Sequence, residues 1–100
     1  MANKKLNDKD AISVFKNVVD PELHLDIWTL GLIYGFKIKK ENKIDVDMTF
    51  TTPACPYAPQ LVGDLENRLR KAGFTPELDF VFEPPWEPSD EVKELLGLPV

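Results

Sequence analysis

Cysteine and histidine are scarce in this 100-residue sequence, which holds one of each, Cys55 and His24. A lone cysteine cannot form a disulfide within the chain, so oxidative cross-linking does not stabilise the fold, and a reduced thiol suits a reducing compartment. A closed metal site needs four protein ligands, and one cysteine with one histidine falls short of that number. A second chain, a client protein or a small thiol would have to complete any such site.

Positive charge is also scarce, because 12 Lys and Arg residues stand against 17 Asp and Glu residues, for a net charge of −5. Contacts to phosphate need clustered Lys and Arg, so we expect neither nucleic acid nor an anionic membrane as a partner. The basic residues that do cluster surround a predicted hairpin and indicate a solvated strand face. They are Lys37, Lys39, Lys40 and Lys43.

Long apolar runs are missing as well. No segment is long and apolar enough to cross a bilayer, and the polar stretch from Met1 to Lys5 is unlike a secretory signal. We therefore expect a cytoplasmic protein. With 43% hydrophobic and 29% charged residues, the chain can bury one compact core, and we expect one domain over residues 1–100.

Three segments have helical periodicity. The first begins after Asn7, a suitable N-cap, and should end at Val19 because the residue before Pro21 avoids helical dihedrals. The second ends at Gly73 and a third, short one follows Ser89. Their apolar faces are, in order, Ala11, Phe15, Val18 and Val19; Ala58, Leu61, Leu65, Leu69 and Ala72; and Val92, Leu95 and Leu96.

Strands are predicted from alternating apolar residues on either side of a turn at residues 41–43. The inward faces are Tyr34, Phe36 and Ile38 on the first strand and Ile44, Val46, Met48 and Phe50 on the second. Gly31 and Gly35 mark a tight turn or a bulge. A third strand runs from Leu78 to Phe82. The order α-β-β-α-β-α predicts an α/β two-layer sandwich with a small three-stranded mixed sheet and helices packed on it.

Cys55 is the first candidate for chemistry. Pro56 suits the first position of a helix, which would leave Cys55 at the N-cap, where free backbone N–H groups and the helix dipole favour a thiolate. A thiolate is the form that binds metals and transfers sulfur. A buried structural cysteine is the alternative. The preceding Thr51 and Thr52 could donate hydrogen bonds to a sulfur or cap the helix.

The loop that follows the first helix concentrates three carboxylates, those of Asp20, Glu22 and Asp26. They could bind a metal, orient a donor, or solvate and cap a turn, which is the commoner role. His24, in the same loop, is the natural second ligand if one chain holds a metal, although a lone histidine is more often a surface or packing residue.

The segment from Glu83 to Trp86 resembles the catalytic loop of amino-group methyltransferases. Such enzymes need a nucleotide-binding parallel sheet with a glycine-rich turn, and this sequence has no Gly-x-Gly. Prolines that end a strand, with Trp86 covering the end of the sheet, fit better.

Four separated motifs occur in order along the chain: Asp20-Pro21-Glu22, then Leu30-Gly31-Leu32-Ile33-Tyr34, then residues 48–56 with the sequence MTFTTPACP, then Pro84-Pro85-Trp86. Together they resemble the metal-sulfur cluster assembly family of SufT/PaaD type, a domain shared with the eukaryotic cytosolic iron–sulfur targeting factor. Two positions depart from its pattern: Leu23-His24 replaces a small residue such as glycine, and Glu83 replaces Asp.

The resemblance implies an α/β fold and a role in maturing or delivering iron–sulfur clusters, with the family's reactive cysteine at Cys55. It also implies that Asp20, Glu22, Thr51 and Thr52 line one pocket. The expected cofactor is iron or an iron–sulfur cluster, held transiently rather than stably. The expected partners are the assembly machinery and client apoproteins, and a homodimer that shares a cluster stays open.

Our leading hypothesis is a non-enzymatic assembly factor in which Cys55 ligates iron, the acidic loop tunes access, and apolar surface near Trp86 contacts a client. A metal-free adaptor that docks an assembly machine or an oxygenase is the alternative. An enzyme ranks last, because no general base beyond His24 and no cofactor site are evident.

Overall fold

The computed structural model describes residues 5–51 and 58–97 of the chain. Its elements are α1 (Asp8–Phe15), α2 (Ile27–Leu30), β1 (Ile33–Ile38), the 3-10 turn η1 (Lys40–Asn42), β2 (Lys43–Met48), α3 (Ala58–Lys71), β3 (Thr75–Phe80) and α4 (Asp90–Leu96). The predicted α/β class and three-stranded mixed sheet are confirmed. The four-residue helix α2 was not predicted.

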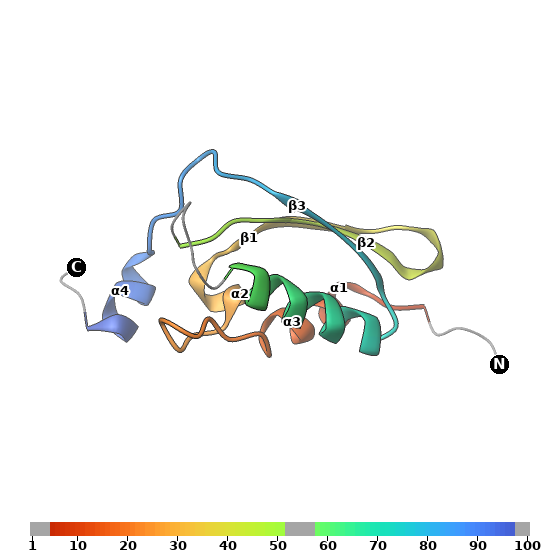
Figure 1. Ribbon diagram of the computed structural model, residues 1–100, viewed down its shortest axis with the longest axis horizontal. Coiled ribbons are helices and arrows are strands. Elements are labelled where there is room, and N and C mark those ends of the chain that lie inside the picture. Colours follow the sequence, from red (N-terminus) through yellow and green to blue (C-terminus); the bar gives the residue numbers. More distant parts are fainter. Residues whose placement is uncertain (1–4, 52–57, 98–100) are drawn as a thin grey trace.

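The sheet has the order β1-β2-β3, in which β1 and β2 are antiparallel and β2 and β3 are parallel. The parallel pair needs a crossover, and α3 provides it. As a result, the start of β1, the ends of β2 and β3, and the start of α3 all lie at one end of the sheet, on the left in Figure 1. We call this the loop end.

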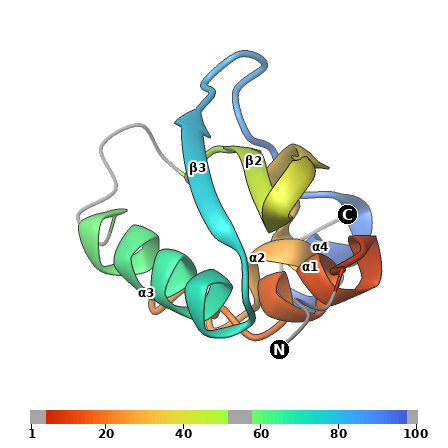
Figure 2. The same cartoon turned by 90° about the vertical axis from the view of Figure 1, so that its right-hand side faces the viewer.

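Helices α1 and α3 lie on one side of the sheet, as Figures 1 and 2 show. The core between the layers is built from apolar residues of both helices and all three strands. Its fully buried members include Phe15, Val18, Ile27, Leu30, Leu32, Ile44, Val46, Met48, Leu65, Leu69 and Val92. Burial of this much apolar surface is the main force that holds the layers together.

None of the described helices covers the opposite side of the sheet, which we call the bare face. Most of its residues are charged and lie in rows across the sheet. Lys37 pairs with Asp45, which pairs with Glu77, and Gly35 pairs with Asp47, which pairs with Asp79. Alternation of apolar and charged residues along each strand produces this division.

Helix α1 begins as predicted but ends four residues early. The Asn7 side chain accepts a hydrogen bond from the N–H of Asp10 at 3.0 Å, and the N–H of Asn7 donates to Oδ2 of Asp10 at 2.9 Å, which completes a capping box. The prediction that the helix continues to Val19 is wrong. The Asn17 amide donates to the carbonyl of Ser13 at 2.7 Å, and this competition with the backbone ends the helix before Pro21 can.

Tyr34 does not share the buried face of β1 with Phe36 and Ile38, contrary to the prediction. Pairing with β2 shifts register between Ile33 and Gly35, so a bulge inserts Tyr34 as an extra residue. Ile33 takes the inward position opposite Met48, and the ring of Tyr34 is exposed. The predicted bulge at Gly35 is thus confirmed, and it is the reason that Tyr34 changes sides.

Strand β3 begins three residues earlier than predicted, at Thr75, and ends at Phe80. Pro76 stands inside the strand and pairs in register with Ile44 of β2. Proline is tolerated there because β3 is an edge strand whose outer side needs no ladder hydrogen bond. Gly73, with φ of 104°, ends α3 in the left-handed region as predicted.

The hairpin between β1 and β2 carries the clustered lysines on its exposed surface, as predicted. Lys39 and Asp45 form an ion pair of 2.6 Å. The hydrogen bond to Asp45 and its negative charge raise the pKa of the Lys39 ammonium above the usual value. Within residues 5–51 and 58–97, no helix is long and apolar enough to cross a membrane.

Candidate functional site

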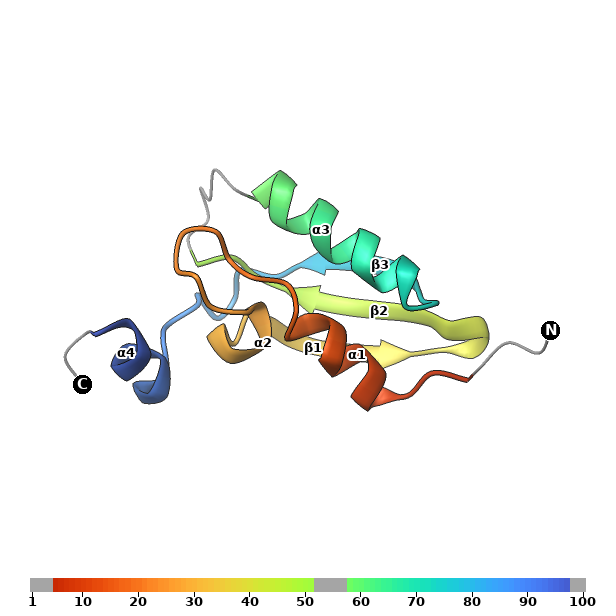
Figure 3. The ribbon, with the colours of Figure 1, turned by 90° about the horizontal axis from the view of Figure 1, so that it is seen from below.

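The acidic loop and the start of α3, which are described segments next to predicted site residues, lie together at the loop end. A hollow of about 240 Å³ lies between Val19 and Pro21 of the first loop and Gln60, Leu61 and Asp64 of α3. Figure 3 shows this loop running near the start of α3. The acidic loop and the first turns of α3 are therefore neighbours, although about 40 residues separate them in the sequence.

Asp20 is the structural centre of the acidic loop. Its side chain is only 2% exposed, and its Oδ1 accepts hydrogen bonds from the N–H groups of Glu22 at 2.8 Å and Leu23 at 3.0 Å. Its carbonyl accepts from the N–H of His24 at 2.8 Å, and its N–H donates to Leu25. The side chain and carbonyl of Asp20 thereby hold the turn of residues 20–24 together, which is a common role of aspartate in loops.

Glu22 and His24 project from the turn that Asp20 closes, and both are exposed. His24 has a φ of 61°, in the left-handed region that L-residues with a Cβ rarely adopt. Its imidazole is therefore presented to solvent from a tightly fixed backbone.

Asp26, the third predicted carboxylate, has a different role. It is the N-cap of α2, and its Oδ2 accepts a hydrogen bond from the N–H of Thr29 at 2.8 Å. Asp20 and Asp26 are thus both engaged with backbone N–H groups. Among residues 5–51 and 58–97, no three Cys, His, Asp or Glu side chains are placed to hold a metal ion together.

Thr51 is half-buried at the end of the segment that leaves β2, directly after the buried Phe50. Cys55 and Thr52 lie outside the described residues, as does the predicted N-cap position before Pro56. The described chain resumes at Ala58, where α3 begins. The predicted pocket of Asp20, Glu22, Thr51, Thr52 and Cys55 stays a prediction.

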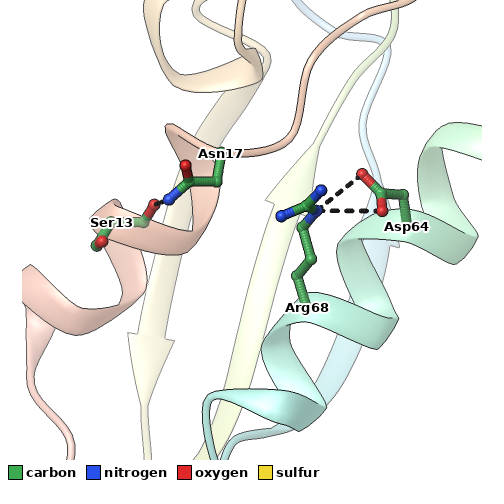
Figure 4. A network of polar contacts seen from close by, with 4 residues as sticks. All are labelled: Ser13, Asn17, Asp64 and Arg68. Carbon is green, nitrogen blue, oxygen red and sulfur yellow. Dashed lines mark hydrogen bonds and ion pairs between the residues drawn. The ribbon is translucent and has the colours of Figure 1, made fainter.

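An ion pair lies on the surface of α3 near the acidic loop. Arg68 Nε contacts both carboxylate oxygens of Asp64 at 3.1 Å, on the side of α3 that faces the end of α1 (Figure 4). The pair is spaced four residues apart, which suits a helix. Because Asp64 lines the hollow beside Pro21, its charge is already balanced there by Arg68.

Exposed aromatic rings mark the loop end. Phe80 and Phe82 are 46% and 43% exposed, and both rings contact the buried ring of Phe50, at centroid distances of 5.5 and 6.2 Å. Apolar rings left in solvent on a small protein are typical of a contact surface. Sequence patterns had assigned Phe80 and Phe82 to a strand and not to a site.

Trp86, predicted to contact a partner, is half-buried and fixed. Its indole N–H donates to the carbonyl of Leu30 at 2.6 Å, which ties it to the end of α2. It also lines a pocket together with Tyr34, Asp47 and Glu83. Sequence analysis missed Tyr34 and Asp47, and only the bulge at Gly35 could have placed Tyr34 on this side.

Residues 8–73 match the family model described as "Iron-sulfur cluster assembly protein". The chain belongs to this family. The matched residues include the acidic loop, β1, β2 and α3, and β3 follows the matched range.

Relatives in the family agree with this assignment. The chain is 38% identical to the Fe-S protein maturation auxiliary factor SufT of Staphylococcus aureus over 71 residues, which cover 69% of this chain and 81% of the relative. It is 32% identical to the Fe-S protein maturation auxiliary factor YitW of Bacillus subtilis over 80 residues, which cover 78% of each. The fold is similar to a conserved hypothetical protein of Thermotoga maritima, with 39% identity, a TM-score of 0.83, and coverage of 97% of this chain and 100% of the other.

The first departure from the family pattern has a backbone explanation. A glycine is favoured where φ is positive, and His24 occupies such a position with φ of 61°. The turn therefore explains why a small residue suits this loop. Histidine in its place adds an exposed imidazole to the loop without changing the turn.

Proposed function

We propose that this protein is a maturation factor for iron–sulfur proteins, in which Cys55 transiently ligates iron or a cluster that passes to a client. The observation that carries the proposal is the family match over residues 8–73, which includes the acidic loop and the segment between β2 and α3. In this proposal iron is cargo and not a resident cofactor.

The position of Cys55 in the sequence supports a reactive thiol. The segment that carries it joins the end of β2 to the start of α3, two described points at the loop end. Helix α3 has 14 residues, and the positive end of its dipole favours a thiolate close by. Arg68 balances Asp64, the acidic residue of α3 nearest this end, so that carboxylate opposes a thiolate less.

Ligands other than Cys55 are needed to complete the coordination of iron. His24 is the second candidate ligand, since its exposed imidazole stands on a fixed turn in the acidic loop. Cys55 and His24 together supply two of the four protein ligands that an iron–sulfur cluster usually has. The remaining ligands come from a client, a small thiol or a second copy of this chain, and in the last case iron loading would convert monomer to dimer.

The client protein contacts the exposed aromatic rings at the loop end. Phe80 and Phe82 offer exposed rings beside Phe50, and Trp86 adds a rigid aromatic edge. Aromatic residues of this kind are frequent anchors in protein interfaces. The protein acts without turnover of its own, as a carrier that binds, holds and releases.

The test is anaerobic incubation of the purified chain with ferrous iron and sulfide, followed by desalting, absorbance and bound-iron assay. The wild type should keep iron and a charge-transfer chromophore, and Cys55→Ala should lose both. Thr29→Ser, which keeps its main-chain contact to Asp26, is the matched control and should load like the wild type.

The alternative is a metal-free adaptor, which the exposed aromatic rings would serve equally well. If the wild type and Cys55→Ala both return from desalting without iron, the carrier proposal fails and the adaptor takes its place. If the wild type does keep iron, sedimentation of the loaded and unloaded protein distinguishes a dimer that shares a cluster from a carrier that works as a monomer.

A further inference from the structure

A pocket of about 750 Å³ lies where the bare face of the sheet meets the segment after β3. It is bounded by the end of α2, the bulge of β1, one residue of β2 and the chain that leads to α4. Its aromatic and charged lining residues are Tyr34, Asp47, Glu83, Trp86 and Glu87. A concave site with a few converging polar groups is the usual form of a binding site.

Both aromatic rings of the pocket are held in place before any ligand arrives. The hydroxyl of Tyr34 donates to the carbonyl of Pro84 at 2.8 Å, and the indole N–H of Trp86 donates to the carbonyl of Leu30 at 2.6 Å. Each bond joins residues at least 50 positions apart in the sequence. A wall fixed in this way costs little ordering entropy on binding.

The charge of the pocket has one sign. Asp47, Glu83 and Glu87 line it, and its lining includes no Lys, Arg or His. Asp47 also stands directly beside Asp79 on β3, with Gly35 on its other side, and like charges in such cross-strand positions repel. The ion pairs of the described chain involve other carboxylates, namely Asp45, Asp64 and Glu66.

We infer that this pocket binds an arginine side chain of a partner protein. A guanidinium is planar, stacks on aromatic rings and forms paired hydrogen bonds with carboxylates, which are the two kinds of group that line the pocket. It would also relieve the repulsion between Asp47 and Asp79. A protein with net charge −5 attracts a basic segment at long range. The inference does not depend on Cys55.

The test uses the whole chain, labelled with nitrogen-15, and the tripeptide acetyl-Gly-Arg-Gly-amide. We expect saturable shifts of the Trp86 indole N–H and the Gly31 amide, with a Kd of about 1 mM that rises with salt. The same peptide with citrulline, which has the shape of arginine but no charge, should not bind, and the lysine peptide should bind more weakly. Equal binding of citrulline or lysine, or no saturation by about 10 mM, overturns the inference.

Two matched variants locate the binding site. Asp47→Asn should weaken binding of the arginine peptide about threefold to fivefold, as for a partly exposed ion pair. Glu94→Gln removes the same charge from an exposed position of α4 outside the pocket and should leave binding unchanged. An equal loss in both variants would mean that net charge alone attracts the peptide. Cys55→Ala should bind the peptide normally, so failure of the iron-carrier proposal leaves this test intact.

Discussion

The indole N–H of Trp86 lies 2.6 Å from the carbonyl oxygen of Leu30, and this hydrogen bond ties the segment after β3 to the end of α2. Leu30 is the last residue of α2, and Gly31 ends that helix with a φ of 77°. A Cβ on Gly31 would lie 4.0 Å from the same indole nitrogen. A Cβ would make only an ordinary contact there, so the positive φ and not the space beside Trp86 favours glycine at residue 31.

Trp86→Phe should destabilise the protein by about 1 kcal/mol, because a phenyl ring replaces the indole and the N–H donor to Leu30 is lost. Tyr34→Phe removes the hydroxyl that donates to Pro84 at a more exposed position and should cost about 0.5 kcal/mol. Urea unfolding followed by circular dichroism measures both. A larger loss for Tyr34→Phe than for Trp86→Phe would contradict the assignment of the indole hydrogen bond as the stronger tie.

Asp20→Ala should cost about 2 kcal/mol, since it leaves the N–H groups of Glu22 and Leu23 without their acceptor inside a buried turn. Asp20→Asn keeps an oxygen at the same place and should cost less than about 1 kcal/mol. Chemical denaturation compares the two. Similar losses in both variants would mean that the charge of Asp20, and not its acceptor geometry, holds the turn.

His24→Gly should unfold at the same temperature as the wild type or slightly higher, because glycine adopts a φ of 61° without a steric penalty. His24→Val places a β-branched residue in the same region and should cost about 1–2 kcal/mol. If His24 is a ligand, the well-folded His24→Gly variant should keep less iron after anaerobic loading. Full iron content in this variant would limit His24 to its place in the turn.

Phe82→Ser should slow the maturation of an apo iron–sulfur reporter enzyme while leaving the unfolding free energy within about 0.5 kcal/mol, as is usual for an exposed side chain. Leu95→Ser is the matched control, because Leu95 is 55% exposed on α4 and away from the rings of Phe50 and Phe80. Equal effects of the two substitutions on maturation would reject Phe82 as a contact residue.

Sequence patterns predicted correctly those helices in which propensity, capping residues and apolar spacing all indicate the same structure. The leucines of α3, spaced at Leu61, Leu65 and Leu69, are all buried as expected, and the caps at Asn7 and Ser89 are present. In these cases propensity, capping and burial favour the same structure. The sheet of one antiparallel and one parallel pair followed from the order of these elements.

The misplaced boundaries have long-range causes that local patterns do not contain. Pro76 enters β3 because that strand is at the edge of the sheet, which depends on the whole topology. Tyr34 turns to the bare face because the bulge at Gly35 depends on pairing with β2. Helix α2 is short and owes its start to the side chain of Asp26, which had been considered as a ligand.

The position of the candidate site stays a prediction, because Thr52 and Cys55 lie outside the described residues. The family resemblance implied that the acidic loop and the segment before α3 line one pocket, and among the described residues the loop borders a hollow with the first turns of α3. Yet two of the three carboxylates accept hydrogen bonds from the backbone. A short polar side chain in a loop satisfies the backbone as readily as it binds a ligand, and sequence alone does not distinguish the two.

The most direct test of the central claim is the rate at which an apo iron–sulfur reporter enzyme regains activity, under anaerobic conditions with limiting iron and sulfide. The wild-type protein should raise that rate, and Cys55→Ala, confirmed as folded by its circular dichroism, should not. If Cys55→Ala matures the reporter as fast as the wild type does, the protein works without its thiol and the carrier mechanism is wrong.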